Sequence, residues 1–242
     1  MRPTRGPWHK PPAMSSLLLP SLTLPGDPPV TVALRRTRAA RRLSLRVSAT
    51  DGRVTLTLPP RTPLREAQAF ARSREGWIRG HLATLPPPLP PVPGATIPLR
   101  GRPVALLPGP RPLLDGDRLL LPPGREAPAL KAFLKESARA DAAPLVALHA
   151  ARLGRPVRAL SLRDPRARWG SCTASGAIML SWRLVMAPPL VLDAVAAHEC
   201  AHLVHLDHSP LFWATLSSIC PAWPEAKAWL RRHGPGLHAL RL

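Results

Sequence analysis

Tyrosine is absent from the 242-residue sequence, and cysteine and phenylalanine occur only three times each. The absence of tyrosine excludes a phenol hydroxyl from any catalytic role. The cysteines are odd in number and widely spaced, so they form neither a disulfide framework nor a C-x-x-C metal knuckle. They are Cys172, Cys200 and Cys220. We expect them to be small packing residues in a reducing compartment.

Long apolar runs are also missing. No stretch approaches the roughly eighteen residues that a membrane-spanning helix needs. The basic segment Met1–Lys10 is followed by the apolar Leu17–Leu19, but Pro20 and Pro25 interrupt this run, which is too short for a secretory signal. The sequence therefore predicts a soluble, cytoplasmic protein with no membrane partner. It also predicts a disordered tail over residues 1–30.

Acidic residues are scarce: 34 Lys and Arg against 14 Asp and Glu give a net charge of +20. Only four of the basic residues are lysines and 34 residues are prolines, a bias typical of GC-rich coding. The densest basic stretch contains Arg35, Arg36, Arg38, Arg41, Arg42 and Arg46. It could contact phosphates, but its second half alternates with apolar residues like the solvated face of a strand. Nucleic acid is therefore a weakly supported partner, since a basic patch specifies only nonspecific binding.

The predicted strands include two β-hairpins. Residues 42–49 and 53–58 alternate in hydrophobicity around Asp51-Gly52. Residues 113–114 and 118–121 flank a second turn, Asp115-Gly116-Asp117. Further strands are expected at residues 96–99, 104–107 and 157–162.

Helices are expected between and after these strands. One begins at Thr62-Pro63 and continues toward residue 82. Another covers residues 127–153, is interrupted or kinked at Pro144, and ends at Gly154. The Pro-rich residues 85–94 are typical of a stiff linker. This order of elements predicts an α+β fold.

The most informative motif is His198-Glu199-Cys200-Ala201-His202. Residues four apart lie on one face of an α-helix about one turn apart, so His198 and His202 can converge on one ion. Glu199 projects about 100° away from His198 and is placed to deprotonate a metal-activated water rather than to bind the metal. This is the H-E-x-x-H arrangement of zinc peptidases. A closed structural site is the alternative, but cysteine dominates the ligands of such sites.

A third ligand is expected just beyond the motif helix. Ser209 and Pro210 have the pattern of an N-cap and first position of another helix, so the motif helix must end around residues 204–207. His208 then lies in the turn, where it can fold back and leave a fourth position open for water. His205 competes for this role. On a continued helix, however, it would lie about 7–8 Å further along the axis than the midpoint between His198 and His202. We therefore expect His205 at the rim, where it could bind substrate or the water.

These motifs resemble the YgjP-like metallopeptidase family, small zincins related in motif to SprT-type proteases. The resemblance covers roughly residues 31–233 and rests on Arg168-Trp169-Gly170-Ser171-Cys172, Ala177–Leu184, Ala187-Pro188-Pro189, His198-Glu199-x-x-His202-Leu203, His208-Ser209 and Phe212-Trp213. It implies zinc, a third histidine after five intervening residues, and an edge strand over Ala177–Leu184 beside the active-site cleft. The chain has Asp207 where the family commonly has asparagine, and Cys200 where an aliphatic residue is common. Neither departure removes a ligand or the base.

We therefore expect a zinc metallopeptidase of the metalloendopeptidase type that acts on proteins or peptides. One Zn²⁺ per chain would be held by His198, His202 and His208, with Glu199 as the general base. Three regions are predicted: a tail over residues 1–30, a β/α region with the Pro-rich linker over 31–94, and a zincin-like metallohydrolase region over 95–236. A single family domain over residues 31–236 is the alternative.

Two other functions stay open at this point. A metal-dependent hydrolase of nucleotide phosphoanhydrides could use the same site, with arginines clamping phosphates, although no Walker-type loop is present. A non-enzymatic, zinc-stapled module that binds nucleic acid would need a closed fourth ligand, for which only Cys172 or Cys220 is available.

Donors for an oxyanion are limited by the absence of tyrosine. Arg168, Arg183 and His205 are the candidates, and a structural ion pair or a solvated face explains the two arginines at least as well. Most of the large aromatic residues near the motif are expected to be core packing. They are Trp169, Trp182, Phe212, Trp213, Trp223 and Trp229.

Overall fold

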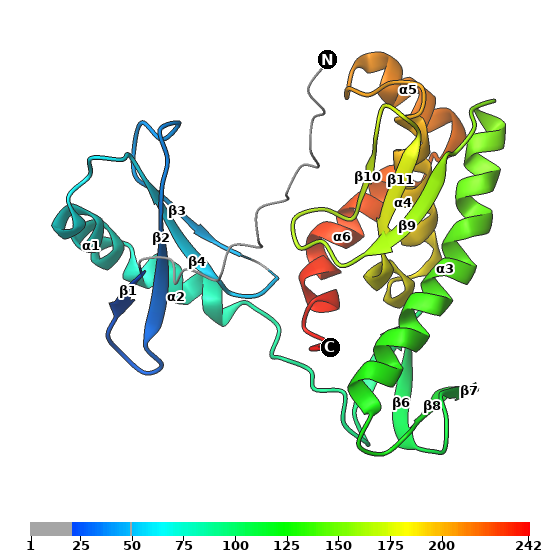
Figure 1. Ribbon diagram of the computed structural model, residues 1–242, viewed down its shortest axis with the longest axis horizontal. Helices are drawn as coiled ribbons and strands as arrows, with labels where there is room; N and C mark the ends of the chain where they lie inside the picture. Colours follow the sequence, from blue (N-terminus) through cyan, green and yellow to red (C-terminus); the bar gives the residue numbers. More distant parts are fainter. Residues whose placement is uncertain (1–20, 49) are drawn as a thin grey trace, which may run out of the picture. The chain divides into compact units, whose positions relative to one another are not determined.

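The computed structural model describes residues 21–48 and 50–242, which form two compact units of mixed helices and strands (Figure 1). Unit 1 comprises residues 21–48 and 52–84 of the described chain, and unit 2 comprises residues 50–51 and 85–242. The division falls between Thr84 and Leu85, so the Pro-rich stretch belongs to unit 2. The α+β class predicted from the sequence is confirmed.

Unit 1 is a four-stranded sheet with two helices on one face. The strands follow the order β1-β2-β4-β3, in which β2 and β4 are parallel and the other neighbours are antiparallel. The elements are β1 (Ser21–Leu24), β2 (Val30–Arg36), β3 (Ser44–Val47), β4 (Val54–Leu58), α1 (Leu64–Ser73) and α2 (Glu75–Ala83). Alternate strand residues are buried against Ala67, Ala71 and Ile78 of the helices. The β3–β4 pair confirms the first predicted hairpin.

Two features of unit 1 differ from the sequence predictions. Strand β1 lies within the segment predicted as a tail, because Leu22 and Leu24 alternate into the core. The rest of that predicted tail, residues 1–20, lies outside the described residues. The helix predicted from Thr62-Pro63 onward is two helices, separated at Arg74.

Unit 2 contains two sheets. The four-stranded sheet has the order β5-β6-β8-β7, and the three-stranded sheet has the order β10-β11-β9. The strands are β5 (Thr96–Leu99), β6 (Arg102–Pro108), β7 (Leu113–Asp115), β8 (Arg118–Leu121), β9 (Ala159–Arg163), β10 (Gly170–Cys172) and β11 (Ala177–Ser181). The antiparallel β7–β8 pair confirms the second predicted hairpin.

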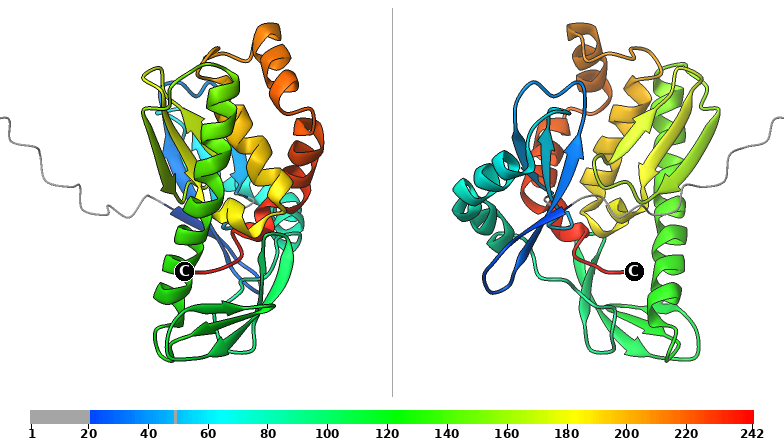
Figure 2. Two further views of the ribbon diagram at one scale, coloured as in Figure 1. Left: turned by 90° about the vertical axis from the view of Figure 1, so that its right-hand side faces the viewer. Right: turned by 60° about the vertical axis from the view of Figure 1, so that its left-hand side comes forward.

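The helices of unit 2 are packed around α4. They are α3 (Glu126–Arg152), the 3-10 helix η1 (Trp182–Met186), α4 (Pro189–Ala201), α5 (Pro210–Ile219) and α6 (Trp223–Leu237). Helix α4 contacts α3, α6, β10 and β11, and Figure 2 shows α3 and α4 side by side behind the three-stranded sheet. Most residues of α4 are buried, as expected for a helix that is apolar on nearly all sides. His149 Nε2 of α3 also donates a hydrogen bond to Asp193 of α4 (2.7 Å).

Helix α3 and strand β11 correct two predictions. Of the interruption or kink predicted at Pro144, the interruption is wrong: α3 is helical on both sides of Pro144, because its buried face packs along its whole length while Pro144 is exposed. The predicted edge strand Ala177–Leu184 is wrong: β11 is the central strand, paired with β9 on one side and β10 on the other, and residues after Ser181 form η1. The edge strand beside α4 is β10.

The Pro-rich stretch predicted as a linker is hydrogen-bonded to the C-terminal segment. Leu89 N–H donates to the carbonyl of Ala239 (2.9 Å), and Arg241 N–H donates to the carbonyl of Leu89 (3.1 Å). Within residues 21–48 and 50–242, no helix combines the length and the apolar character that crossing a membrane requires.

Candidate metal centre

Three histidines meet at the C-terminal end of α4. Helix α4 ends at Ala201 with His202 as its C-cap, a few residues earlier than predicted, because Leu203 and Val204 form a tight turn back to the last helical carbonyls. The next helix begins as predicted: Ser209 accepts a hydrogen bond from Phe212 N–H (3.4 Å).

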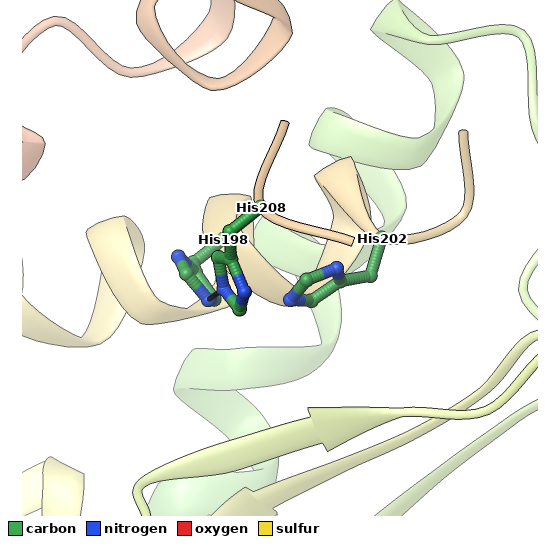
Figure 3. Close-up of side chains that lie close together, drawn as sticks. All are labelled: His198, His202 and His208. Carbon is green, nitrogen blue, oxygen red and sulfur yellow. Dashed lines mark hydrogen bonds between the residues drawn. The ribbon is translucent and has the colours of Figure 1, made fainter. Parts of the chain in front are cut away.

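The turn between the two helices returns His208 to His198 and His202 (Figure 3). One ligand nitrogen from each of the three rings lies within 4.8 Å of the others. Among the described residues this is the one such cluster of histidine, cysteine or acidic side chains, and His205 is not part of it.

The spacing of the His198 and His208 ring nitrogens fits a zinc ion. Nε2 of His198 lies 3.3 Å from Nε2 of His208. Two nitrogens bonded to one tetrahedral zinc at about 2.0–2.1 Å are about 3.3–3.4 Å apart. Three neutral imidazoles are also a common donor set for a catalytic zinc, with the fourth position left for water or substrate.

His205 contributes to this centre through its backbone. Nδ1 of His202 donates to the carbonyl of His205 (2.9 Å). A carbonyl can only accept, so Nδ1 carries the proton and Nε2 keeps its lone pair for a metal. This backbone role was not foreseen from the sequence, because it depends on the tight turn that ends α4.

Aromatic side chains from α5 and α6 enclose the three histidines. Phe212 is fully buried and stacks on His202, with ring centres 4.5 Å apart. Trp223 stacks on His198, also at 4.5 Å, and Trp213 lies beside His208 at 5.5 Å. Most of these aromatic residues were expected from the sequence to be core packing. Phe212 and Trp223 also restrict the imidazole rings, which the sequence did not indicate.

Burial favours the neutral form of His198 and His202. It lowers the pKa of His198 to about 4, and the nearby charges of His202, His208 and Lys227 act in the same direction. Burial also lowers the pKa of His202. Because only an unprotonated imidazole can bind a metal, these shifts favour the state that a metal requires.

Glu199 lies beside this cluster on α4 and is only 5% exposed. Burial raises the pKa of its carboxyl group to about 7, and the Arg168 guanidinium opposes this shift. A carboxyl group with a pKa near neutrality is suited to accept and return a proton.

Edge strand β10 passes directly over Glu199 at Gly170. A Cβ atom at Gly170 would lie 2.4 Å from Oε1 of Glu199 and 2.6 Å from its Cγ. These separations are shorter than any ordinary contact, so only glycine fits here without moving the carboxylate. The Trp169-Gly170-Ser171 segment therefore fixes the position of Glu199.

Arg183, one of the candidate oxyanion donors, has a structural role instead. Arg183 is buried and donates to both carboxylate oxygens of Asp164 and to the carbonyls of Leu237 and Leu240. Its guanidinium is thus engaged away from the histidines.

The three cysteines are free, as predicted. Burial raises the pKa of Cys172 to about 11 and that of Cys200 to about 12, and it also raises the pKa of Cys220. The thiols are therefore protonated near neutral pH. A protonated thiol is a poor metal ligand.

Comparison with known proteins identifies the family. The model of the YgjP-like, metallopeptidase domain matches residues 41–233, which is more than three quarters of the 242-residue chain. The chain therefore belongs to the YgjP-like metallopeptidase family, as the sequence motifs indicated. No match was found among curated proteins or among solved structures.

Proposed function

We propose that this metallopeptidase binds one zinc ion through His198, His202 and His208 and uses Glu199 as its general base. The observation that carries the proposal is the convergence of the three imidazoles next to a buried carboxyl group with a raised pKa. A bound zinc would supply Lewis acidity, acidifying a water and polarising the scissile carbonyl.

The protein groups would handle the protons and the orientation. Glu199 accepts a proton from the attacking water and returns it to the leaving nitrogen, so one carboxyl group serves both steps. Gly170 and the helix backbone hold that carboxyl group in place, and burial maintains its pKa. With Arg183 engaged elsewhere, Arg168 and His205 remain as candidate donors to the oxyanion.

An extended peptide could add to the free edge of β10, which takes the place that the sequence assigned to residues 177–184. Two hollows lie near the turn between β10 and β11, and Thr173 lines both of them. One, of about 510 Å³, is lined by Arg168, Ser171 and Met179 among others, and one, of about 280 Å³, includes Gly176 and His202. We infer the endopeptidase type, because a peptide added to an edge strand can extend past the metal centre in both directions and needs no chain end there.

The alternative functions have less support. A zinc staple needs a closed site, but within the described residues neither Cys172 nor Cys220 joins the histidine cluster. A phosphoanhydride hydrolase needs several cations around the metal to clamp the phosphates. The basic groups whose charge acts on the centre are two: Arg168, which acts on Glu199, and Lys227, which acts on His198. The cytoplasmic location expected from the sequence remains a prediction.

The test is Glu199→Gln, which keeps the size and hydrogen bonding of the side chain but removes the proton acceptor. We expect unchanged folding, near-native zinc content, and peptide hydrolysis reduced by at least about a hundredfold, the scale of losing a general base. Zinc would be measured by elemental analysis, and activity with casein and quenched fluorescent peptides.

A parallel assay with nucleoside triphosphates separates the alternatives. Loss of zinc from Glu199→Gln would make Glu199 a ligand and contradict its role as base. Hydrolysis of triphosphates without peptide cleavage, or no zinc in the parent protein, would overturn the proposed function.

A further inference from the structure

The positive charge is concentrated in unit 1. Residues 21–48 and 52–84 contain twelve arginines and no lysine, against three acidic residues: Asp27, Glu66 and Glu75. Residues 50–51 and 85–242 contain 19 basic and 11 acidic residues. The net charges of the two units are thus similar, at +9 and +8, although unit 2 is more than twice as long. A coding bias raises arginine along the whole chain and does not explain this difference in density.

Five of these arginines are exposed at one end of the sheet, on β2, on β3 and in the loop between them, and we call this set the arginine face. Arg35 ends the open side of β2, Arg46 lies on β3, and the loop between the two strands carries the other three. The arginine face consists of Arg35, Arg38, Arg41, Arg42 and Arg46, and all five are exposed.

Register places Arg35 and Arg46 on the same side of the sheet. Val32 and Leu34 of β2 point into the core with α1 and α2, so Arg35 lies on the opposite, open side. Arg46 pairs with Thr55 of β4, and Arg35 pairs with Thr57. Arg35 and Arg46 are therefore two strands and two residues apart, roughly 12 Å for ordinary sheet spacings.

The arginine face is not neutralised by the protein. Within residues 21–48 and 50–242, no ion pair or hydrogen bond involves the five guanidinium groups. Other arginines of unit 1 do have structural roles: Arg36 donates to the carbonyls of Pro60 and Thr62, and Arg79 pairs with Glu75. Five charges held near one another without partners repel one another, and this repulsion is relieved when a polyanion binds.

The open side of the sheet fits a phosphate backbone rather than bases. Between the two sheet arginines it presents small residues: Ala33, Ser44, Thr55 and Thr57. None of them is aromatic, so the surface has no platform for base stacking, whereas hydroxyl groups and guanidinium groups both donate hydrogen bonds to phosphate oxygens.

We propose that the arginine face binds the phosphate backbone of nucleic acid without reading its sequence. Charge complementarity selects the partner, and binding is independent of sequence because contacts to phosphate carry no sequence information. The face would bring the peptidase to proteins that are bound to nucleic acid. This inference does not depend on the metal centre.

The experiment is fluorescence anisotropy of the full chain with a labelled oligothymidine and with a duplex, each about 30 nucleotides or base pairs long, over a range of salt. The test variant carries Arg35→Gln, Arg41→Gln, Arg42→Gln and Arg46→Gln. A matched control removes the same charge from exposed sites of unit 2 through Arg111→Gln, Arg125→Gln, Arg139→Gln and Arg158→Gln.

We expect the parent and the control to bind alike, and the test variant to bind at least about tenfold more weakly. The slope of log K against log salt should fall by about 2–3 in the test variant, since each lost phosphate contact on a single strand removes about 0.7. Replacing the same four arginines with lysine should restore most of the binding. Comparison of single strand with duplex shows which form is bound.

Three results would overturn the proposal: no binding of either oligonucleotide by the parent at low salt, equal weakening in the test variant and the control, or binding to anionic lipid vesicles but not to oligonucleotides. Thermal melting of all variants confirms that each is folded, and zinc content provides a second check that unit 2 is intact.

Discussion

Gly170→Ala is the smallest change that should disable the candidate active site without touching a metal ligand. Gly170 lies on edge strand β10, where a new methyl group would meet the side chain of Glu199. The backbone of Gly170 is not in the left-handed region, so alanine is compatible with the strand itself.

The magnitude follows from the distances. Ordinary contacts of a Cβ atom begin at 3.4 Å, and the nearest atom of Glu199 is at 2.4 Å, so the carboxylate must retreat by 1.0 Å. A displacement of about 1 Å at a reacting group can cost on the order of a hundredfold in rate. The three atoms nearest to the new methyl group all belong to Glu199 and none to a histidine, so zinc binding should persist. Crowding should also lower the free energy of unfolding by about 1–3 kcal/mol.

Turnover of quenched fluorescent peptides, zinc content and urea unfolding would be measured on the same preparations. Gly76→Ala is the matched control, because its Cβ atom would meet nothing within 4 Å on exposed helix α2. The control should keep full activity and gain about 0.5–1 kcal/mol from helix propensity. If folded, zinc-loaded Gly170→Ala keeps its turnover within about threefold of the parent, the placement of Glu199 by β10 is not what supports catalysis.

Two further outcomes are expected. His208→Ala should lose zinc, whereas His205→Ala should retain it, because His205 contributes only a backbone carbonyl, which alanine also has. Zinc content would be measured by elemental analysis, and equal content in the two variants would contradict the ligand set. Burial, with the charge of Arg183, lowers the pKa of His238 to about 4. In the unfolded chain this imidazole binds a proton at its ordinary pKa near 6.5, whereas in the folded protein it does so only near pH 4. The free energy of unfolding should therefore fall by about 3 kcal/mol as the pH is lowered from above 6.5 toward 4. His238→Phe should flatten this part of the stability profile in urea unfolding, and an unchanged difference between pH 7 and pH 4.5 would refute the assignment.

Local patterns predicted the elements that local forces determine. The Asp-Gly pairs at residues 51–52 and 115–116 lie in the turns of the two hairpins that they predicted. In each turn the glycine adopts a positive φ (69° and 59°), which most other residues disfavour. The N-cap at Ser209 predicted where α5 begins, and this placed His208 in the turn beside the other two histidines.

Long-range pairing could not be predicted in the same way. The central position of β11 depends on a parallel partner, β9, with a turn and another strand between them in sequence. Strand β1 is only four residues long and lies between prolines at positions 20 and 25, so its local sequence does not indicate a strand. It is a strand because it pairs with β2. Helix α3 passes through Pro144 because tertiary packing outweighs the local preference.

The candidate site was predictable in its ligand types and not in its surroundings. Histidine spacing predicted that His198, His202 and His208 lie together, as they do. The stacking of Trp223 on His198 and the closeness of Gly170 to Glu199 join residues 25 and 29 positions apart. No periodicity or spacing rule reports such contacts, because they depend on how β10 and α6 pack against α4.

The hydrogen bonds that join Leu89 to Ala239 and Arg241 have a consequence for synthesis on the ribosome. About 150 residues separate the partners, so at about 5–20 residues per second Leu89 waits roughly 8–30 s for them to be made. The carbonyl partners of buried Arg183, at Leu237 and Leu240, are made equally late. The contacts within unit 1 need no residue after Thr84, so they can form while most of unit 2 is still being translated.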